Sequence, residues 1–319
     1  MRAFTRARSA VVAAAAIAAV CAACGSSPAS QSGSGNVGSA GAGFPVTVTT
    51  AAGKTQVSSR PGSIISLSAT VTEMLYSIGA GSQVKAVDGY SDYPHGTPIT
   101  KLSGFEPNAE AIAAYKPDLV IISNNIDNIT AKLTALSIPV LDLPAAANLS
   151  GVYAELNELG AATGHVTQAQ TEDQKIRTAI ATIVASEPKH SAPITYYYEL
   201  GANPYYSVTD STFIGSLLSL LGMKSIADSA SGAAAAGGYP ELSPEFIFKA
   251  DPDYILLSDT GNNGGQTLAS LTARPGWTAL TAVQDKHVIA LNADVASRWG
   301  PRVVQLLQTV ATVVKSGSS

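Results

Sequence analysis

Hydrophobic positions along most of the chain form short apolar runs that alternate with segments of helical spacing. Residues 63–67 form a short apolar run suited to a buried strand, and the other strand candidates are residues 84–87, 119–122, 140–143, 194–200, 254–257 and 287–291. The helical segments are residues 70–78, 109–115, 129–137, 213–221 and 301–314. Strands that alternate with helices in this way predict parallel sheets with helices packed on their faces.

One longer segment, residues 166–186, contains neither Gly nor Pro and places Ile176, Ile180 and Ile183 at helical spacing. At 1.5 Å per residue, a helix of about 20 residues is ~30 Å long, which is enough to run from one compact lobe to another. We therefore expect an α/β fold of two lobes, each with a mainly parallel central sheet flanked by helices, joined by one long rigid helix.

Local signals mark where some of these elements begin. Thr70 with Glu73, and Thr167 with Gln170, match the capping box that starts many helices. Ahead of the first apolar run, residues 46–49 alternate as a strand does, and residues 52–54 offer a turn.

The N-terminus carries a different pattern. Three arginines precede a run of 15 apolar residues from Ala10 to Cys24, which is typical of a secretory signal and shorter than the ~20 residues of a membrane-spanning helix. The ending of this run, VCAACG, resembles a bacterial lipobox, which implies that Cys24 is acylated and becomes the first residue. An ordinary signal peptide cut nearby is the alternative.

Residues 25–44 contain 15 Gly, Ser or Ala out of 20, a composition that behaves as flexible coil. The expected organisation is a signal peptide over 1–23, an acylated Cys and tether over 24–44, an N-terminal lobe over 45–165, a connecting helix over 166–190 and a C-terminal lobe over 191–319. The product is then exported and lipid-anchored to the outer face of the cell membrane.

The two expected lobes share a sequence repeat. NAEAIAAYKPDLVIIS (108–123) and SPEFIFKADPDYILLS (243–258) match at a constant offset, with five identical residues that include Glu110 with Glu245 and Asp118 with Asp253. This match predicts that the fold repeats, although chance in a narrow composition and a duplicated helix pair are alternatives. Glu110 and Glu245 either stabilise the first turns of two helices or form one acidic knob per lobe on a two-pronged docking surface.

Composition narrows the possible functions. The chain has 46% hydrophobic and 13% charged residues, which excludes a mostly unfolded protein, and its net charge of −4 gives nucleic acid no electrostatic reason to bind. Both cysteines lie near the N-terminus, which excludes a disulfide framework and a cysteine zinc site. Loss of residues 1–23 removes three arginines and no acid, so the exported product is more acidic.

No catalytic motif stands out. The chain has no HExxH, Walker loop or Gly-x-Ser-x-Gly elbow, and its four histidines lack metal-ligand spacing. We therefore expect no enzyme, no resident cofactor and no metal site.

Aromatic residues are scarce but gather in the expected loops, where α/β folds bind ligands. Any single ring packs under its loop as readily as it contacts a ligand, whereas the whole set indicates a cleft for a large, partly apolar, flat ligand. Polar groups near the last strand would fix its orientation, although Arg302 could instead lie on a helix face and pair with an acid. The candidate ligand-binding residues are Tyr90, Tyr93, Phe105, Tyr205, Tyr206, Tyr239, Asp294, Arg298 and Trp299.

Residues 60–94 (RPGSIISLSATVTEMLYSIGAGSQVKAVDGYSDYP) and the NAEAIAAYKPDLVIIS segment resemble the substrate-binding proteins of ABC importers for metal chelates. These are the ferric-siderophore, haem and cobalamin receptors, and the YSDYP and ELSPE segments are most similar to the cobalamin receptors. The resemblance implies a monomer that binds its chelate between two lobes and delivers it to a permease and its ATPase.

The resemblance also implies roles for residues. Tyr93, Phe105, Tyr239 and Asp294 would lie near the ligand, and the acidic knobs at Glu110 and Glu245 would dock onto basic residues of the permease. The cobalamin receptors tend to have tryptophan where this chain has Phe105 and Asn124, which keeps ferric siderophore and haem open as ligands. For an iron chelate, whose carboxylate or catecholate groups carry negative charge, Arg298, Arg302 and Tyr206 become the more important candidates. An exported hydrolase or adhesin that uses the same cleft is the alternative from another class.

Overall fold

The computed structural model describes residues 43–188, 191–261 and 265–317, which belong to one compact unit. The predicted signal peptide, Cys24 and nearly all of the tether lie outside the described residues.

The N-terminal half is built on a four-stranded parallel sheet in the order β4-β3-β5-β6. An antiparallel hairpin of β1 (Val46–Thr50) and β2 (Gly53–Val57) precedes it. The sheet strands are β3 (Ile64–Ser66), β4 (Val84–Val87), β5 (Leu119–Ile122) and β6 (Val140–Asp142). The helices are α1 (Ala69–Ser77), α2 (Ala109–Ala113), α3 (Ile129–Ala135) and α4 (Leu149–Thr163), with short 3₁₀ turns at Gly81–Gln83 and Ile126–Asn128.

The C-terminal half has a second four-stranded parallel sheet, in the order β10-β7-β12-β13, and a small antiparallel sheet of β8, β9 and β11. Its strands are β7 (Ile194–Glu199), β8 (Gly201–Ala202), β9 (Tyr205–Tyr206), β10 (Met223–Ser225), β11 (Glu241–Leu242), β12 (Tyr254–Leu257) and β13 (Val288–Ala290). Its helices are α6 (Phe213–Ser219), α7 (Pro244–Ala250), α8 (Leu268–Thr272), α9 (Thr281–Gln284), α10 (Ala293–Ser297) and α11 (Val303–Gly317), with 3₁₀ turns at Ile226–Ser229 and Trp277–Ala279.

The predicted repeat is confirmed by the strand order. In each parallel sheet the first strand pairs with the second on one side and with the third on the other, and the fourth follows the third. The matched acids do the same work, because Asp118 accepts the backbone N–H of Ser63 (2.9 Å) ahead of β3 and Asp253 accepts that of Thr195 (2.7 Å) in β7. Each therefore ties the start of its central strand to the neighbouring strand.

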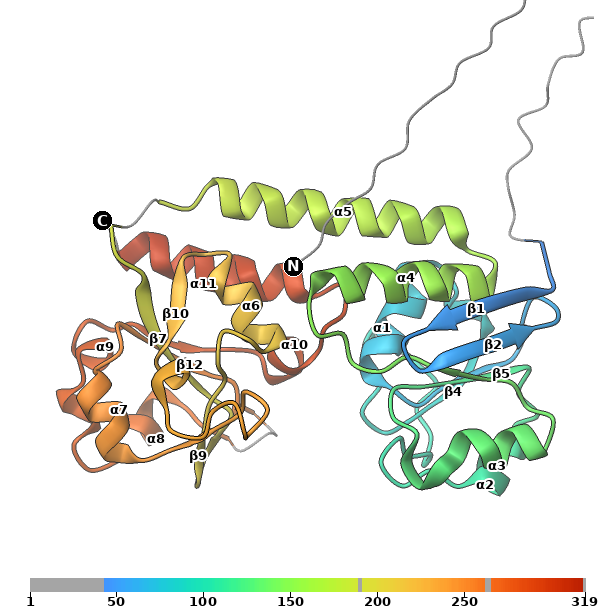
Figure 1. The fold of residues 1–319 in the computed structure, drawn as a ribbon, viewed down its shortest axis with the longest axis horizontal. Coiled ribbons are helices and arrows are strands. Elements are labelled where there is room, and N and C mark those ends of the chain that lie inside the picture. Colours follow the sequence, from blue (N-terminus) through green and yellow to red (C-terminus); the bar gives the residue numbers. More distant parts are fainter. Residues whose placement is uncertain (1–42, 189–190, 262–264, 318–319) are drawn as a thin grey trace, which may run out of the picture. The chain divides into compact units, whose positions relative to one another are not determined.

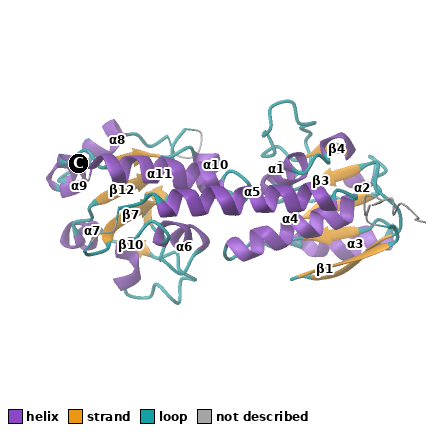
Figure 2. Ribbon diagram, turned by 90° about the horizontal axis from the view of Figure 1, so that it is seen from above, coloured by secondary structure: helices purple, strands orange, loops and turns teal. Residues whose placement is uncertain are grey.

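The long helix predicted between the halves is α5 (Val166–Ala185), which is continuous and packs on both α4 and α11. Figures 1 and 2 show it running alongside these two helices. Because α4 belongs to the N-terminal half and α11 to the C-terminal half, α5 is the element that both halves share.

The helix α4 was absent from the prediction, because Gly151 and Gly160 interrupt its apolar pattern. The structure shows why glycine stands at 160: a Cβ there would lie 2.5 Å from the Cβ of Ala169 on α5. Close packing of α4 on α5 therefore requires a residue that sequence patterns associate with helix ends.

The two predicted capping boxes are wrong. Helix α1 begins at Ala69 and is capped by Ser68, whose Oγ accepts the N–H of Val71 (3.4 Å). Helix α5 follows α4 after a two-residue turn and has no side-chain cap. Because Ser68 caps the helix, Glu73 takes no part in the cap, and its actual partners are described below.

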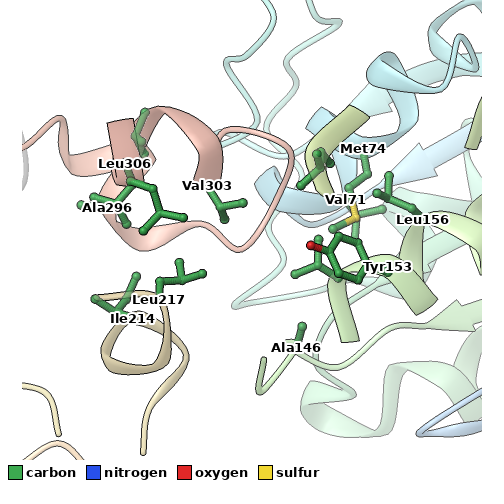
Figure 3. Close-up of a cluster of buried hydrophobic side chains, with 14 of the residues drawn as sticks. Val71, Met74, Ala146, Tyr153, Leu156, Ile214, Leu217, Ala296, Val303 and Leu306 are labelled. Atoms are coloured by element: carbon green, nitrogen blue, oxygen red, sulfur yellow. The ribbon is translucent and has the colours of Figure 1, made fainter. Parts of the chain in front are cut away.

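Buried hydrophobic residues of the described part of the chain form three clusters, one within each half and a third that has members in both halves. Full burial of each Val, Leu, Ile or Met side chain among them stabilises the fold by roughly 1.5–3 kcal/mol. Figure 3 shows Val71, Met74, Tyr153 and Leu156 from α1 and α4, and Ile214, Leu217, Val303 and Leu306 from α6 and α11.

Candidate functional site

Exposed aromatic side chains mark the loops that follow the parallel strands. Among the described residues six aromatic side chains other than histidine are exposed, and five of them are in the predicted ligand-binding set. The loop after β4 carries three of them and the segment between β10 and β11 carries one, whereas Tyr206 lies on the short strand β9, where the sequence predicted a loop. They are Tyr90 (64% exposed), Phe105 (62%), Tyr239 (46%), Tyr93 (43%) and Tyr206 (42%).

Tyr90 and Phe105 form an edge-to-face pair with ring centroids 5.6 Å apart. The backbone N–H of Tyr90 donates to Asp88 (3.1 Å), which is buried, and burial raises the pKa of that carboxyl group. The loop also passes close to β3, since a Cβ on Gly104 would lie 2.3 Å from the carbonyl oxygen of Leu67. Glycine at this position is what allows Phe105 to project beside Tyr90.

Arg298 connects the loop after β13 to the loop after β4. It is buried, and its Nη2 donates to the carbonyl oxygen of Tyr90 (2.9 Å), to Asp294 (2.9 Å) and to Asp92 (3.2 Å). Its Nη1 donates to Glu73 on α1 (2.7 Å). The loops at the carboxyl ends of both sheets therefore meet at this guanidinium, which is engaged with protein groups.

Arg302 has the alternative role considered from the sequence, since it pairs with an acid. Its Nε donates to Glu73 (2.9 Å), and its guanidinium lies 4.1 Å from the ring centre of Tyr93. Sequence reasoning took Glu73 for a cap and missed this role. The sequence signal for a buried partner was the position of Glu73 as the one acid on a helix whose other residues are apolar or small.

The remaining two rings in the candidate set are half-buried. Trp299 packs against the shared core, and its Nε1 donates to Glu155 on α4 (2.9 Å). Tyr205 lies against Trp277, with ring centroids 5.3 Å apart. Both have protein partners, so their contact with a ligand stays a prediction.

The carboxyl group of Glu155 is buried, which raises its pKa to about 8 against the opposing hydrogen bond from Trp299. The folded state keeps this proton up to about pH 8, whereas the unfolded state releases it near pH 4.5. The free energy of unfolding should therefore fall as pH rises between these values. We expect Glu155→Gln to match the parent protein at pH 4 and to be more stable by roughly 2–4 kcal/mol at pH 9.

Urea unfolding of Glu155→Gln at pH 4, 6 and 9 measures this effect, with Glu106→Gln, an exposed acid of the same half, as the matched control. Equal pH dependence in the Glu155 variant and the parent protein would contradict the assignment.

A second buried ion pair lies in the C-terminal half. Glu199, at the end of β7, is fully buried and accepts two bonds from Arg274 (2.6 and 2.7 Å). The guanidinium of Arg274 also lies 4.6 Å from the ring centre of Trp277. Nearby, burial and the charge of Glu199 raise the pKa of Asp259 to about 6. No sequence signal joined these residues, which lie far apart along the chain.

The predicted docking acids occupy equivalent places. Glu110 and Glu245 are exposed at the second positions of α2 and α7, which are capped by Asn108 (2.8 Å) and Ser243 (3.2 Å) as expected. Hydrogen bonds from its own backbone N–H and from Ser243 lower the pKa of Glu245.

A further exposed acid precedes each of these caps at the repeat offset. They are Glu106 before Glu110 and Glu241 before Glu245. Each half therefore presents two exposed carboxylates four residues apart.

A cavity of about 420 Å³ lies beside the β1–β2 hairpin. It is lined by polar residues that include Thr50, Lys54, Thr130 and Asp142, and by none of the predicted ligand-binding residues. It has no aromatic lining, so it does not suit a large flat ligand.

The described residues contain no group of three or more His, Cys, Asp or Glu arranged to hold a metal ion. Nor does any helix within the described ranges have the length and apolar character needed to cross a membrane.

Comparison with known proteins agrees with this architecture. Residues 64–295 match the model of a family described as periplasmic binding protein. A cobalamin-binding protein of Halobacterium salinarum is 28% identical over 84% of this chain and 73% of its own length. An ABC transporter substrate-binding lipoprotein of Bacillus subtilis is 27% identical over 84% of this chain and 85% of its own.

Solved structures of periplasmic binding proteins also have this fold. The periplasmic vitamin B12-binding protein of Vibrio cholerae is 27% identical and superposes with a TM-score of 0.66, covering 82% of this chain and 99% of its own. A periplasmic haem-binding protein of Roseiflexus shares the fold at 22% identity, with a TM-score of 0.68 over 81% of this chain and 99% of its own.

Proposed function

Because the chain belongs to the periplasmic binding protein family, we propose that it captures a metal chelate for an ABC importer, with cobalamin as the first candidate. The observation that supports a large flat ligand is the set of exposed rings in the segments that follow strands of both sheets. A macrocycle presents two broad faces, and rings such as Tyr90, Phe105 and Tyr239 would stack on them.

The charge around the arginines favours an uncharged periphery on the ligand. Arg298 and Arg302 carry two positive charges, while Glu73, Asp92 and Asp294 carry three negative ones within the same network. A catecholate or carboxylate siderophore would meet a net negative site. A corrinoid rimmed with amides would find acceptors in the half-exposed side chains of Asp92 and Asp294.

The resemblance supports the remaining parts of the proposal. Acylated Cys24 would anchor the protein to the outer face of the membrane, and the tether would leave the folded part free to reach its permease. Glu110 and Glu245, one in each half, would dock onto basic residues of that permease and bring the ligand to it. The protein would act as a monomer, without chemical turnover and without nucleic acid.

Titration of the purified protein with cyanocobalamin, haemin and a panel of ferric siderophores tests the proposal, with quenching of intrinsic fluorescence as the readout. We expect saturable one-to-one binding of cyanocobalamin that is tighter than binding of any anionic siderophore. Preference for haemin or for a siderophore would reassign the ligand. Turnover of generic esters or glycosides, or binding to a surface polymer with no chelate bound, would support the hydrolase or the adhesin instead.

A further inference from the structure

One buried carboxylate joins two arginines that lie more than 200 residues further along the chain. Glu73 on α1 is 3% exposed and accepts hydrogen bonds from both Arg298 and Arg302. Both guanidinium groups lie against this one carboxylate, so without the acid their like charges would repel each other. A buried, paired guanidinium has few alternative positions, which gives this cluster a defined geometry.

Both arginines act on the loop that carries the candidate rings. Arg298 donates to the carbonyl oxygen of Tyr90 and to the carboxylate of Asp92, while the guanidinium of Arg302 covers one face of Tyr93. Residues from the C-terminal half therefore fix the backbone and one ring of a loop in the N-terminal half. The hydrogen bonds described for the Glu73 carboxylate come from these two arginines and not from the rings.

We infer that Glu73 is a positioning residue for ligand binding. It holds Arg298 and Arg302 in the orientations in which they order residues 90–93, so that Tyr90 and Tyr93 present fixed faces to the ligand. A site whose rings are already ordered loses less conformational freedom when it binds. The effect on a ligand rests on the proposed function, whereas the effect on the loop does not.

Hydrogen–deuterium exchange on the ligand-free protein tests the effect on the loop. The amides of Tyr90, Ser91 and Thr97 are hydrogen-bonded within this loop and report its opening. In Glu73→Gln, which keeps the side-chain size but loses the charge, we expect them to exchange at least about 10-fold faster while the amides of β5 keep their rates.

Glu199→Gln is the matched control, because it also removes the charge of a buried acid paired with an arginine, but its side-chain partners Tyr197 and Arg274 belong to the C-terminal half. It should leave loop exchange unchanged. Loop rates within twofold of the parent protein in Glu73→Gln, or equal acceleration of the loop in both variants, would overturn the inference.

Should Glu73→Gln fold poorly, Arg302→Lys is the second variant. It keeps a positive charge for Glu73 but removes the planar group over Tyr93, and it should speed exchange of the same loop by a smaller factor. An unchanged loop in this variant would count against the inference.

A double-mutant cycle with Tyr93→Ala then tests the effect on the ligand, with cyanocobalamin as the probe. If Glu73 acts through the loop, each single variant should weaken binding about 10-fold and the double variant by much less than 100-fold. Multiplicative losses would contradict action through this ring. If the parent protein does not bind cyanocobalamin, the proposed ligand fails while the exchange result still decides the role of Glu73 in the loop.

Discussion

Reversal of both docking acids, Glu110→Lys with Glu245→Lys, should abolish chelate uptake and leave ligand affinity within about twofold of the parent protein. The two carboxylates are exposed at equivalent positions and lie outside the candidate ring loops. Two lysines placed opposite basic residues of a permease would replace attraction with repulsion, which costs both the encounter rate and the docked complex. Uptake of radiolabelled cyanocobalamin by cells that carry only the variant measures the effect.

The matched control reverses one other exposed acid in each half, Asp127→Lys with Asp285→Lys. It makes the same change in net charge at positions other than Glu110 and Glu245, and it should retain most of the uptake. Equal uptake by the parent protein and by the Glu110 and Glu245 double variant would remove these acids from the docking surface. Equal loss in the control would indicate a non-specific effect of net charge.

Removal of the Tyr90 and Phe105 rings together should weaken cyanocobalamin binding about 100-fold, or ~2.7 kcal/mol. The two rings form one exposed edge-to-face pair, so alanine at both positions removes a whole stacking surface. The hydrogen bond from the Arg298 guanidinium to the carbonyl oxygen of residue 90 can persist in this variant, because it uses a backbone oxygen. The loop therefore need not unfold. Isothermal titration calorimetry measures the loss.

Tyr115→Ala is the control, since Tyr115 is also an exposed ring (43%) of the same half and lies outside the predicted site loops. It should bind as the parent protein does. Affinity within threefold of the parent protein in the ring-pair variant would exclude these rings from the ligand site.

Features that depend on neighbours along the chain were predictable from sequence. The apolar runs at 119–122 and 254–257 coincide with β5 and β12, because a fully buried strand is marked by a continuous run of hydrophobic residues. The repeat could also be predicted, since Asp118 and Asp253 perform the same backbone task in each half.

Features that depend on distant residues were not predictable. Glu73 and Arg298 form an ion pair although they are 225 residues apart in the sequence, and Glu199 and Arg274 are 75 residues apart. No local sequence pattern therefore predicts either pair. Glycine at 160 reads as a helix end although it serves close packing between α4 and α5. In the candidate site, the sequence therefore indicated five of the six exposed rings of the described residues but not the buried ion pairs that hold their loop.

Hydroxyl-radical footprinting with and without saturating cyanocobalamin tests the central claim most directly, because it reports on the exposed rings of both halves in one sample. If one chelate is gripped by both, Tyr90, Phe105 and Tyr239 should oxidise several-fold more slowly with ligand, while Tyr115 should not change. Protection confined to one half, or protection of the hairpin at residues 50–56 in place of the rings, would contradict the account.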